Sequence, residues 1–69
     1  MKSAAESKLI ASKLSKKHDD CNIVLYKTGI DYVTWVEYAR GTDYPVGYKA
    51  WGHYFLSHAE ALADFNARQ

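Results

Sequence analysis

The chain lacks the devices that usually stabilise very small domains. It has 69 residues and a single cysteine, Cys21, so no disulfide can form within it. One cysteine and three scattered histidines also fall short of the four ligands of a structural zinc site. A domain of this length buries only about 60% of the surface of its unfolded chain. Its stability must therefore come from large core side chains or from self-association.

Excess charge and long apolar runs are lacking too. The formal net charge is +1, which favours neither nucleic acid nor an acidic membrane surface as a partner. No apolar stretch approaches the roughly 20 residues that span a bilayer, and the lysine-containing N-terminal segment has no signal-peptide core. Together with the lone cysteine, these absences predict one cytoplasmic domain spanning residues 1–69.

Catalytic motifs are also absent. The chain has no glycine-rich phosphate loop, no ordered nucleophile, base and acid, and no pair of catalytic carboxylates. His53 and His58 have no cysteine or carboxylate at a metal-binding spacing, and HDDC at residues 18–21 is typical of a turn. We therefore expect a protein that is not an enzyme and that binds no metal or cofactor.

Two segments carry helix signals. The S-x-x-E spacing at residues 3–6 is that of a capping box and predicts an amphipathic helix over residues 4–17. The same spacing recurs at Ser57 and Glu60 and predicts a second helix over residues 58–67.

The segment between the helices carries strand signals. The runs IVLYKT, IDYVTWVEYAR and YKAWGHYFL are rich in β-branched and aromatic residues and predict three strands. Thr28 and Gly29 predict a tight turn between the first two. The expected fold is a two-layer α+β domain of order α-β-β-β-α, with a three-stranded antiparallel sheet and both helices on one face.

Aromatic residues are abundant: the chain has ten, and nine lie in the predicted sheet and its loop. Placing Glu37 opposite Lys49 also places Trp35 opposite Trp51, and both pairings are favourable. Because side chains alternate along a strand, this register assigns each residue to a face. The predicted face beneath the helices consists of Ile23, Leu25, Tyr32, Val36, Ala50, Tyr54 and Leu56. The opposite assignment also fits the sequence, because tryptophan and phenylalanine prefer the interior.

The face of the predicted sheet that the helices leave uncovered is available to a partner. Two short helices can cover only one face, so aromatic surface should stay exposed on the other. Tryptophan and tyrosine are favoured in interface hot spots. The predicted protein-binding residues are Val33, Trp35, Glu37, Lys49, Trp51, His53 and Phe55. The expected partner is a larger protein, with a second copy of the chain as the alternative.

Nucleic-acid binding is another candidate function. It would use four lysines of the N-terminal segment to contact phosphates: Lys8, Lys13, Lys16 and Lys17. The predicted element order is also that of double-stranded RNA-binding domains, but SHAEALADF stands where those domains have a lysine-rich helix start. The likeness is limited to topology, and Asp31 and Glu37 disfavour a phosphate track on the sheet.

The segment WGHYFLSHAEALADFNAR, residues 51–68, resembles part of small proteins encoded by phages and mobile elements. In those proteins an aromatic strand of the W-G-H-Y-F kind continues into a helix with an E-A-x-x-D-F pattern. The resemblance covers about a quarter of the chain and carries over no functional residue. It implies an inhibitor of a host defence system, of the anti-CRISPR kind, that binds a larger target stoichiometrically.

Overall fold

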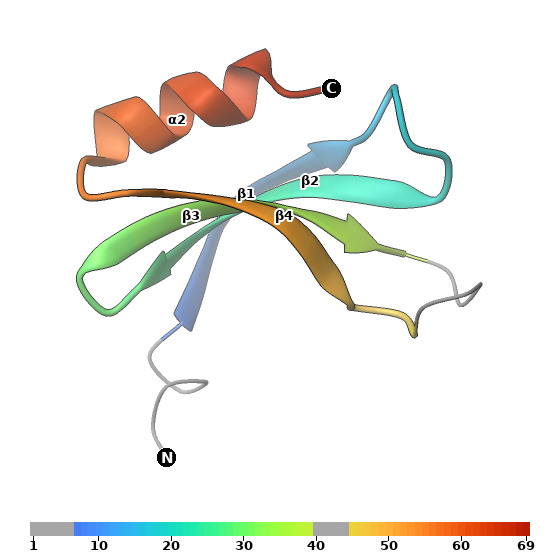
Figure 1. The fold of residues 1–69 in the computed structure, drawn as a ribbon, viewed down its shortest axis with the longest axis horizontal. Helices are drawn as coiled ribbons and strands as arrows, with labels where there is room; N and C mark the ends of the chain where they lie inside the picture. The colour runs from blue at the N-terminus through green and yellow to red at the C-terminus, as the bar shows by residue number, and fades with distance from the viewer. Residues whose placement is uncertain (1–6, 40–44) are drawn as a thin grey trace.

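A computed structural model describes residues 7–39 and 45–69 and contains a four-stranded antiparallel sheet followed by one helix (Figure 1). The strands are β1 (Ser7–Leu14), β2 (Cys21–Thr28), β3 (Asp31–Tyr38) and β4 (Lys49–Phe55). They lie in the sheet in chain order, so every neighbouring pair is consecutive. The helix is α2 (His58–Ala67). The α+β class is as predicted, but the sheet has four strands.

The predicted N-terminal helix is wrong over the residues that the structure describes. Residues 7–14 form β1 instead and pair antiparallel with β2. The register shifts between Leu9 and Ala11, so Ile10 is a bulge residue. The bulge breaks the two-residue alternation of a strand, and pairing with β2 overrides the helical propensity of the segment. The capping-box residues 3–6 lie outside the described residues.

The second helix is confirmed, and a tight turn is present one residue later than the predicted Thr28 and Gly29. Gly29 and Ile30 form a two-residue loop between β2 and β3, and Gly29 has a φ of 61°, which a tight hairpin turn requires. α2 has the predicted bounds. Ser57 is its N-cap, and its Oγ accepts a hydrogen bond from the backbone N of Glu60 at 3.4 Å.

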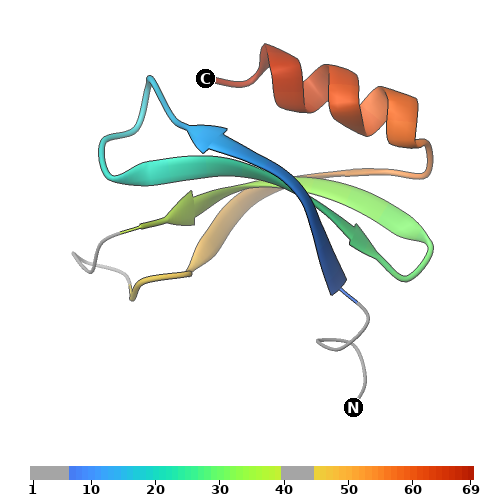
Figure 2. The ribbon, with the colours of Figure 1, turned by 180° about the vertical axis from the view of Figure 1, so that it is seen from behind.

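One face of the sheet packs against α2 and forms the main core. Its centre consists of residues that are at most 7% exposed: Cys21, Ile23, Leu25, Val36, Ala61 and Phe65. Partly buried residues surround it: Ala11, Tyr32, Tyr38 and Phe55. Figures 1 and 2 show from opposite sides that α2 lies along one face of a strongly twisted sheet.

The other face carries a smaller cluster covered by aromatic rings. Val24 lies directly opposite Trp35, and Val33 lies opposite both Tyr26 and Tyr54. Both valines are at most 1% exposed. The Tyr26 and Trp35 rings meet edge to face at 5.6 Å, and the Trp35 and Tyr54 rings at 6.2 Å. Part of the aromatic content therefore protects the strands on the side away from the helix.

The pairing of β3 with β4 agrees with the predicted register at one end only. Glu37 lies opposite Lys49, as predicted. The register then shifts, so that Thr34 lies opposite His53 instead of Gly52. The extra residue of β4 forms a bulge opposite Trp35.

This bulge overturns part of the predicted core. A shift of one residue moves every following side chain to the other face of the sheet. Tyr54 and Leu56, which the prediction places under the helices, are 62% and 74% exposed. Phe55 packs against the core in their place.

Candidate functional site

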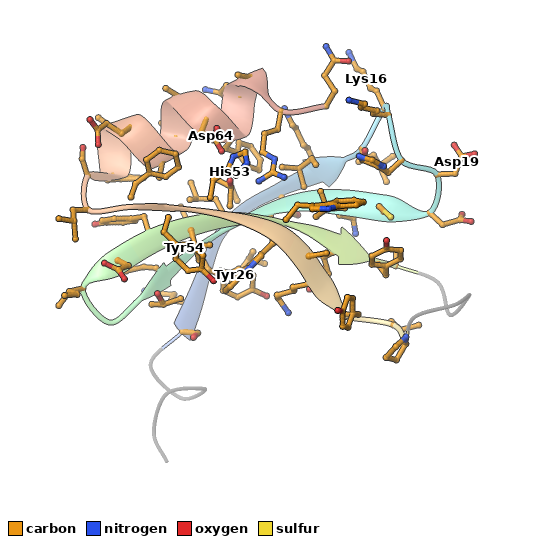
Figure 3. The ribbon with its side chains drawn as sticks, in the orientation of Figure 1. Lys16, Asp19, Tyr26, His53, Tyr54 and Asp64 are labelled. Carbon is orange, nitrogen blue, oxygen red and sulfur yellow. The ribbon has the colours of Figure 1, made fainter. Side chains whose placement is uncertain are left out.

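A polar network joins α2 to the centre of the sheet. The Thr34 side chain is completely buried. Its Oγ1 donates to Oδ2 of Asp64 at 2.6 Å and accepts from Nη1 of Arg68 at 2.9 Å. His53 Nδ1 lies 3.0 Å from the same Asp64 oxygen, and Figure 3 shows the two side chains directed toward each other between helix and sheet. The network ties β3, β4 and α2 together.

Burial, hydrogen bonds and charges in this network shift two pKa values. Burial by itself would raise the pKa of Asp64, but hydrogen bonds from Thr34 and His53, together with the charges of His53 and Arg68, lower it below the ordinary 3.8. Burial lowers the pKa of the Arg68 guanidinium, and the Asp64 carboxylate offsets part of that change. The lowered pKa of Asp64 favours its ionised form, which accepts the hydrogen bonds of this network.

The Asp64–His53 pair has the arrangement of a carboxylate that orients an imidazole. A catalytic use would need a nucleophile within hydrogen-bond reach of the same ring. Among the described residues, Asp64 is the hydrogen-bond partner of the His53 ring. Those residues also hold no group of three or more His, Cys, Asp or Glu side chains that could bind a metal ion. The network thus has a clear structural role, which is to position α2.

Trp51 has a backbone conformation that is unusual for its side chain. Its φ is 54°, in the left-handed region that bulky residues rarely adopt. The side chain is 56% exposed, and its ring lies 4.9 Å from that of His18 in the β1–β2 connection. The strand therefore bulges at a position where a large indole is presented to solvent.

Exposed apolar residues concentrate on β4 and its flanks. Of the ten exposed large hydrophobic side chains in residues 7–39 and 45–69, five lie within residues 46–56. We call them the β4 surface: Val46, Tyr48, Trp51, Tyr54 and Leu56. They are between 44% and 74% exposed. Exposed apolar side chains concentrated on one edge strand are typical of interaction sites.

The predicted protein-binding residues do not all share one face. Val33, Trp35, Glu37 and Lys49 lie on the face away from α2, but Val33 is completely buried. Glu37 and Lys49 form a salt bridge at 3.1 Å.

The remaining three predicted residues lie elsewhere. His53 bonds to Asp64 and Phe55 packs against the core, so both are on the helix side because of the bulge. Trp51 contacts His18. Tyr54, which the prediction assigns to the core, is directed away from α2 together with Tyr26 (Figure 3).

The four lysines of the nucleic-acid hypothesis do not lie along one helix. Lys8 and Lys13 are in β1, and Lys16 and Lys17 follow in the connection to β2. Lys13 Nζ lies 5.0 Å from the centre of the Phe65 ring and donates to the carbonyl oxygen of Asn66 at 3.4 Å. α2 has no basic residue in its last turn, so Lys13 supplies the positive charge that favours a helix C-terminus.

The other candidate chemical groups have packing roles. Cys21 is 5% exposed, and burial, followed by the charges of Asp20 and Asp19, raises the pKa of its thiol. A raised pKa disfavours the nucleophilic thiolate. His58 stacks on Tyr32 at 5.1 Å in the first turn of α2.

The fold and its exposed strand define a small α+β protein with an aromatic edge surface. No protein-family model matches the chain, and neither a curated protein nor a solved structure matches it. Within residues 7–39 and 45–69, no helix is long and apolar enough to cross a membrane.

Proposed function

We propose that this protein is a small, non-enzymatic binding module that docks its β4 surface onto a larger protein. The observation that carries the proposal is Trp51, an exposed indole on a residue with a positive φ. Glycine adopts this conformation without the steric penalty of about 1–2 kcal/mol that other residues incur. A sequence that places tryptophan there forgoes stability and presents the residue type most enriched in hot spots.

The charges beside the β4 surface indicate the chemistry of the partner. Lys49 forms a salt bridge with Glu37, and the His53 ring is hydrogen-bonded to Asp64, so both side chains already have a partner within the chain. The exposed groups between them are aromatic and aliphatic. The complementary partner surface is therefore apolar with a polar rim, as in ordinary protein interfaces. The resemblance of residues 51–68 to phage-encoded proteins supports a host defence effector as that partner and the cytoplasm as the compartment.

A three-bait experiment tests this function. The baits are the wild type, Trp51→Gly, and Ile30→Ser as a matched control, because Ile30 is 79% exposed but lies in the β2–β3 turn. The proteins that each bait captures from a cell lysate are quantified. The most strongly enriched protein is then purified and titrated against each bait by calorimetry. The wild type and Ile30→Ser should bind alike, and Trp51→Gly should bind at least tenfold more weakly, as expected for a hot spot. Equal affinity for all three folded baits would contradict the proposal.

Salt dependence separates this function from nucleic-acid binding. Contacts between apolar surfaces are little affected by screening, so the dissociation constant should change only slightly from about 0.05 M to about 0.5 M salt. Binding of nucleic acid through the lysines should weaken steeply over the same range. A steep response abolished by Lys16→Gln and Lys17→Gln would favour the nucleic-acid alternative.

A further inference from the structure

A pocket lies between the C-terminal end of α2 and the β1–β2 connection. Figures 1 and 2 both show these two segments side by side. Its volume is about 610 Å³, within the range of small-molecule sites. The residues that line it are Lys17, His18, Ile23, Val36, Ala67, Arg68 and Gln69. Neither the fold nor the proposed protein-binding function requires this pocket.

Main-chain hydrogen bonds hold the two walls of the pocket together. The main-chain oxygen of Gln69 accepts from the backbone N of Lys16 at 2.6 Å and of Lys17 at 2.9 Å. The hydroxyl of Ser15 donates to the same oxygen at 2.6 Å and accepts from the backbone N of His18 at 2.9 Å. These bonds use backbone and hydroxyl groups, so the pocket is preformed while its cationic side chains stay available.

Two cationic groups at the pocket have unused hydrogen-bond donors. Arg68 uses Nη1 to bind the carbonyl oxygen and hydroxyl of Thr34, and its Nε and Nη2 have no partner among the described residues. The Lys17 ammonium likewise has none there. His18 adds a third nitrogen-bearing side chain.

The acidic side chains near the pocket leave hydrogen-bond donors of these cations unused. Within the described part of the chain, no Asp or Glu lines the pocket. The Asp64 carboxylate interacts electrostatically with Arg68 but is bonded to Thr34 and His53. Asp19 is directed away from α2 (Figure 3). A carboxylate ligand would therefore find hydrogen-bond donors that have no partner among the described residues.

The remaining lining is apolar and belongs to the core. Ile23 and Val36 are each 1% exposed, and Ala67 continues the apolar wall from the last residue of α2. At the rim, the Trp51 ring adjoins His18. We propose that this pocket binds a carboxylate that carries a short apolar or aromatic group. The carboxylate bonds to Arg68 and Lys17, and the apolar group lies against Ala67, next to the closed core residues Ile23 and Val36.

Methyl NMR of the whole chain tests this site directly. Hydrocinnamate is titrated against the protein, with the neutral hydrocinnamamide as the matched probe. Hydrocinnamate should shift the methyl signals of Ile23, Val36 and Ala67 in a saturable manner, and the amide should not. Lys17→Gln should weaken binding about three- to fivefold, because it removes one partly exposed charge. Lys8→Gln, which changes a lysine of β1 outside the pocket, should leave the affinity unchanged.

Two further arms identify the source of the carboxylate. A peptide that ends in phenylalanine with a free carboxylate is compared with its amidated form. Tighter binding of the free peptide than of hydrocinnamate identifies a protein terminus as the natural ligand, and the reverse identifies a small acid. No saturable shift with either carboxylate at millimolar concentration would overturn the proposal. The proposal would also be overturned if the amides bound as tightly as the carboxylates, or if only methyl groups outside the pocket shifted. None of these outcomes depends on whether the β4 surface binds a protein.

Discussion

At Trp51 the backbone and the side chain have opposite requirements. The positive φ favours glycine, whereas the exposed indole contributes one ring contact, to His18. Trp51→Gly relieves about 1–2 kcal/mol of steric cost and loses a ring contact of about 0.5–1.5 kcal/mol. We expect its free energy of unfolding to stay within about 1 kcal/mol of the wild type, as measured by urea denaturation. A loss of 3 kcal/mol or more, which is about that of a truncated core tryptophan, would show that Trp51 serves the fold.

Gly52, the next residue, is required for its small size. A Cβ atom there would lie 2.7 Å from Nε1 and 3.0 Å from Cδ1 of Trp35. The Trp35 ring is held between Tyr26 and Tyr54 and cannot easily move away. Gly52→Ala should lower the free energy of unfolding by about 1–3 kcal/mol, as overpacking does.

A double-mutant cycle checks that the clash is with Trp35. The smaller ring of Trp35→Phe makes room for the added methyl group. Gly52→Ala should therefore cost less in the Trp35→Phe background than in the wild type. If the two effects are strictly additive, the destabilisation by Gly52→Ala arises in the backbone of the bulge and not from the contact with Trp35.

At the scale of elements, the attachment of α2 to the sheet depends on an ionised Asp64. The pKa of this carboxyl is lower in the folded chain than its ordinary 3.8. Its stabilising contribution is therefore complete well above that value and is lost as the pH falls through the folded pKa. Asp64→Asn should cost about 1–3 kcal/mol at neutral pH through weakened hydrogen bonds to Thr34 and His53. The free energy of unfolding of Asp64→Asn should also decrease less steeply than that of the wild type as the pH falls.

Urea denaturation at a series of pH values measures this effect. Asp19→Asn serves as the control, because Asp19 is exposed in the β1–β2 connection and directed away from α2. Its acid limb should follow that of the wild type. Parallel acid limbs for the wild type and Asp64→Asn would contradict the role of Asp64.

The sequence predicts some elements well and others poorly for physical reasons. α2 and the β2–β3 turn are set by local chemistry, namely the Ser57 cap and the positive φ of Gly29, so the bounds of α2 are predicted correctly and the turn to within one residue. β1 depends on pairing with β2, which the local pattern of residues 7–14 does not reveal. The bulge at Trp51 adds one residue to β4, but the residue pattern of the strand in the sequence gives no sign of it. The face of His53, Tyr54 and Phe55 is therefore predicted wrongly, and with it part of the proposed site.

At the scale of the whole molecule, both edges of the sheet are protected against pairing. β1 is interrupted at Ile10 and β4 at Trp51, and each edge strand carries lysine. Bulges and lysines are the usual means by which proteins prevent edge-to-edge association. We therefore expect sedimentation to show a monomer of 7.8 kDa from micromolar to near-millimolar concentration. A concentration-dependent dimer of the wild type would favour the homo-oligomer alternative.

Removing the bulge in β1 tests whether it prevents association through this edge of the sheet. Deletion of Ile10 should give a regular β1 edge and promote association in the same measurement. Ile10→Ser keeps the bulge and should remain monomeric. If the two variants behave alike, the bulge does not control association.

The strand order has a consequence for how the chain folds. Each strand lies beside the one that precedes it, so the sheet can grow by successive hairpins with short loop closures. The helix and the residues after it bond to distant partners: Thr34 and Asp64 are 30 residues apart, and Lys13 and Asn66 are 53 apart. We therefore expect the hairpins to form early and the docking of α2 to complete folding, with the Thr34–Asp64 hydrogen bond forming after the main kinetic barrier.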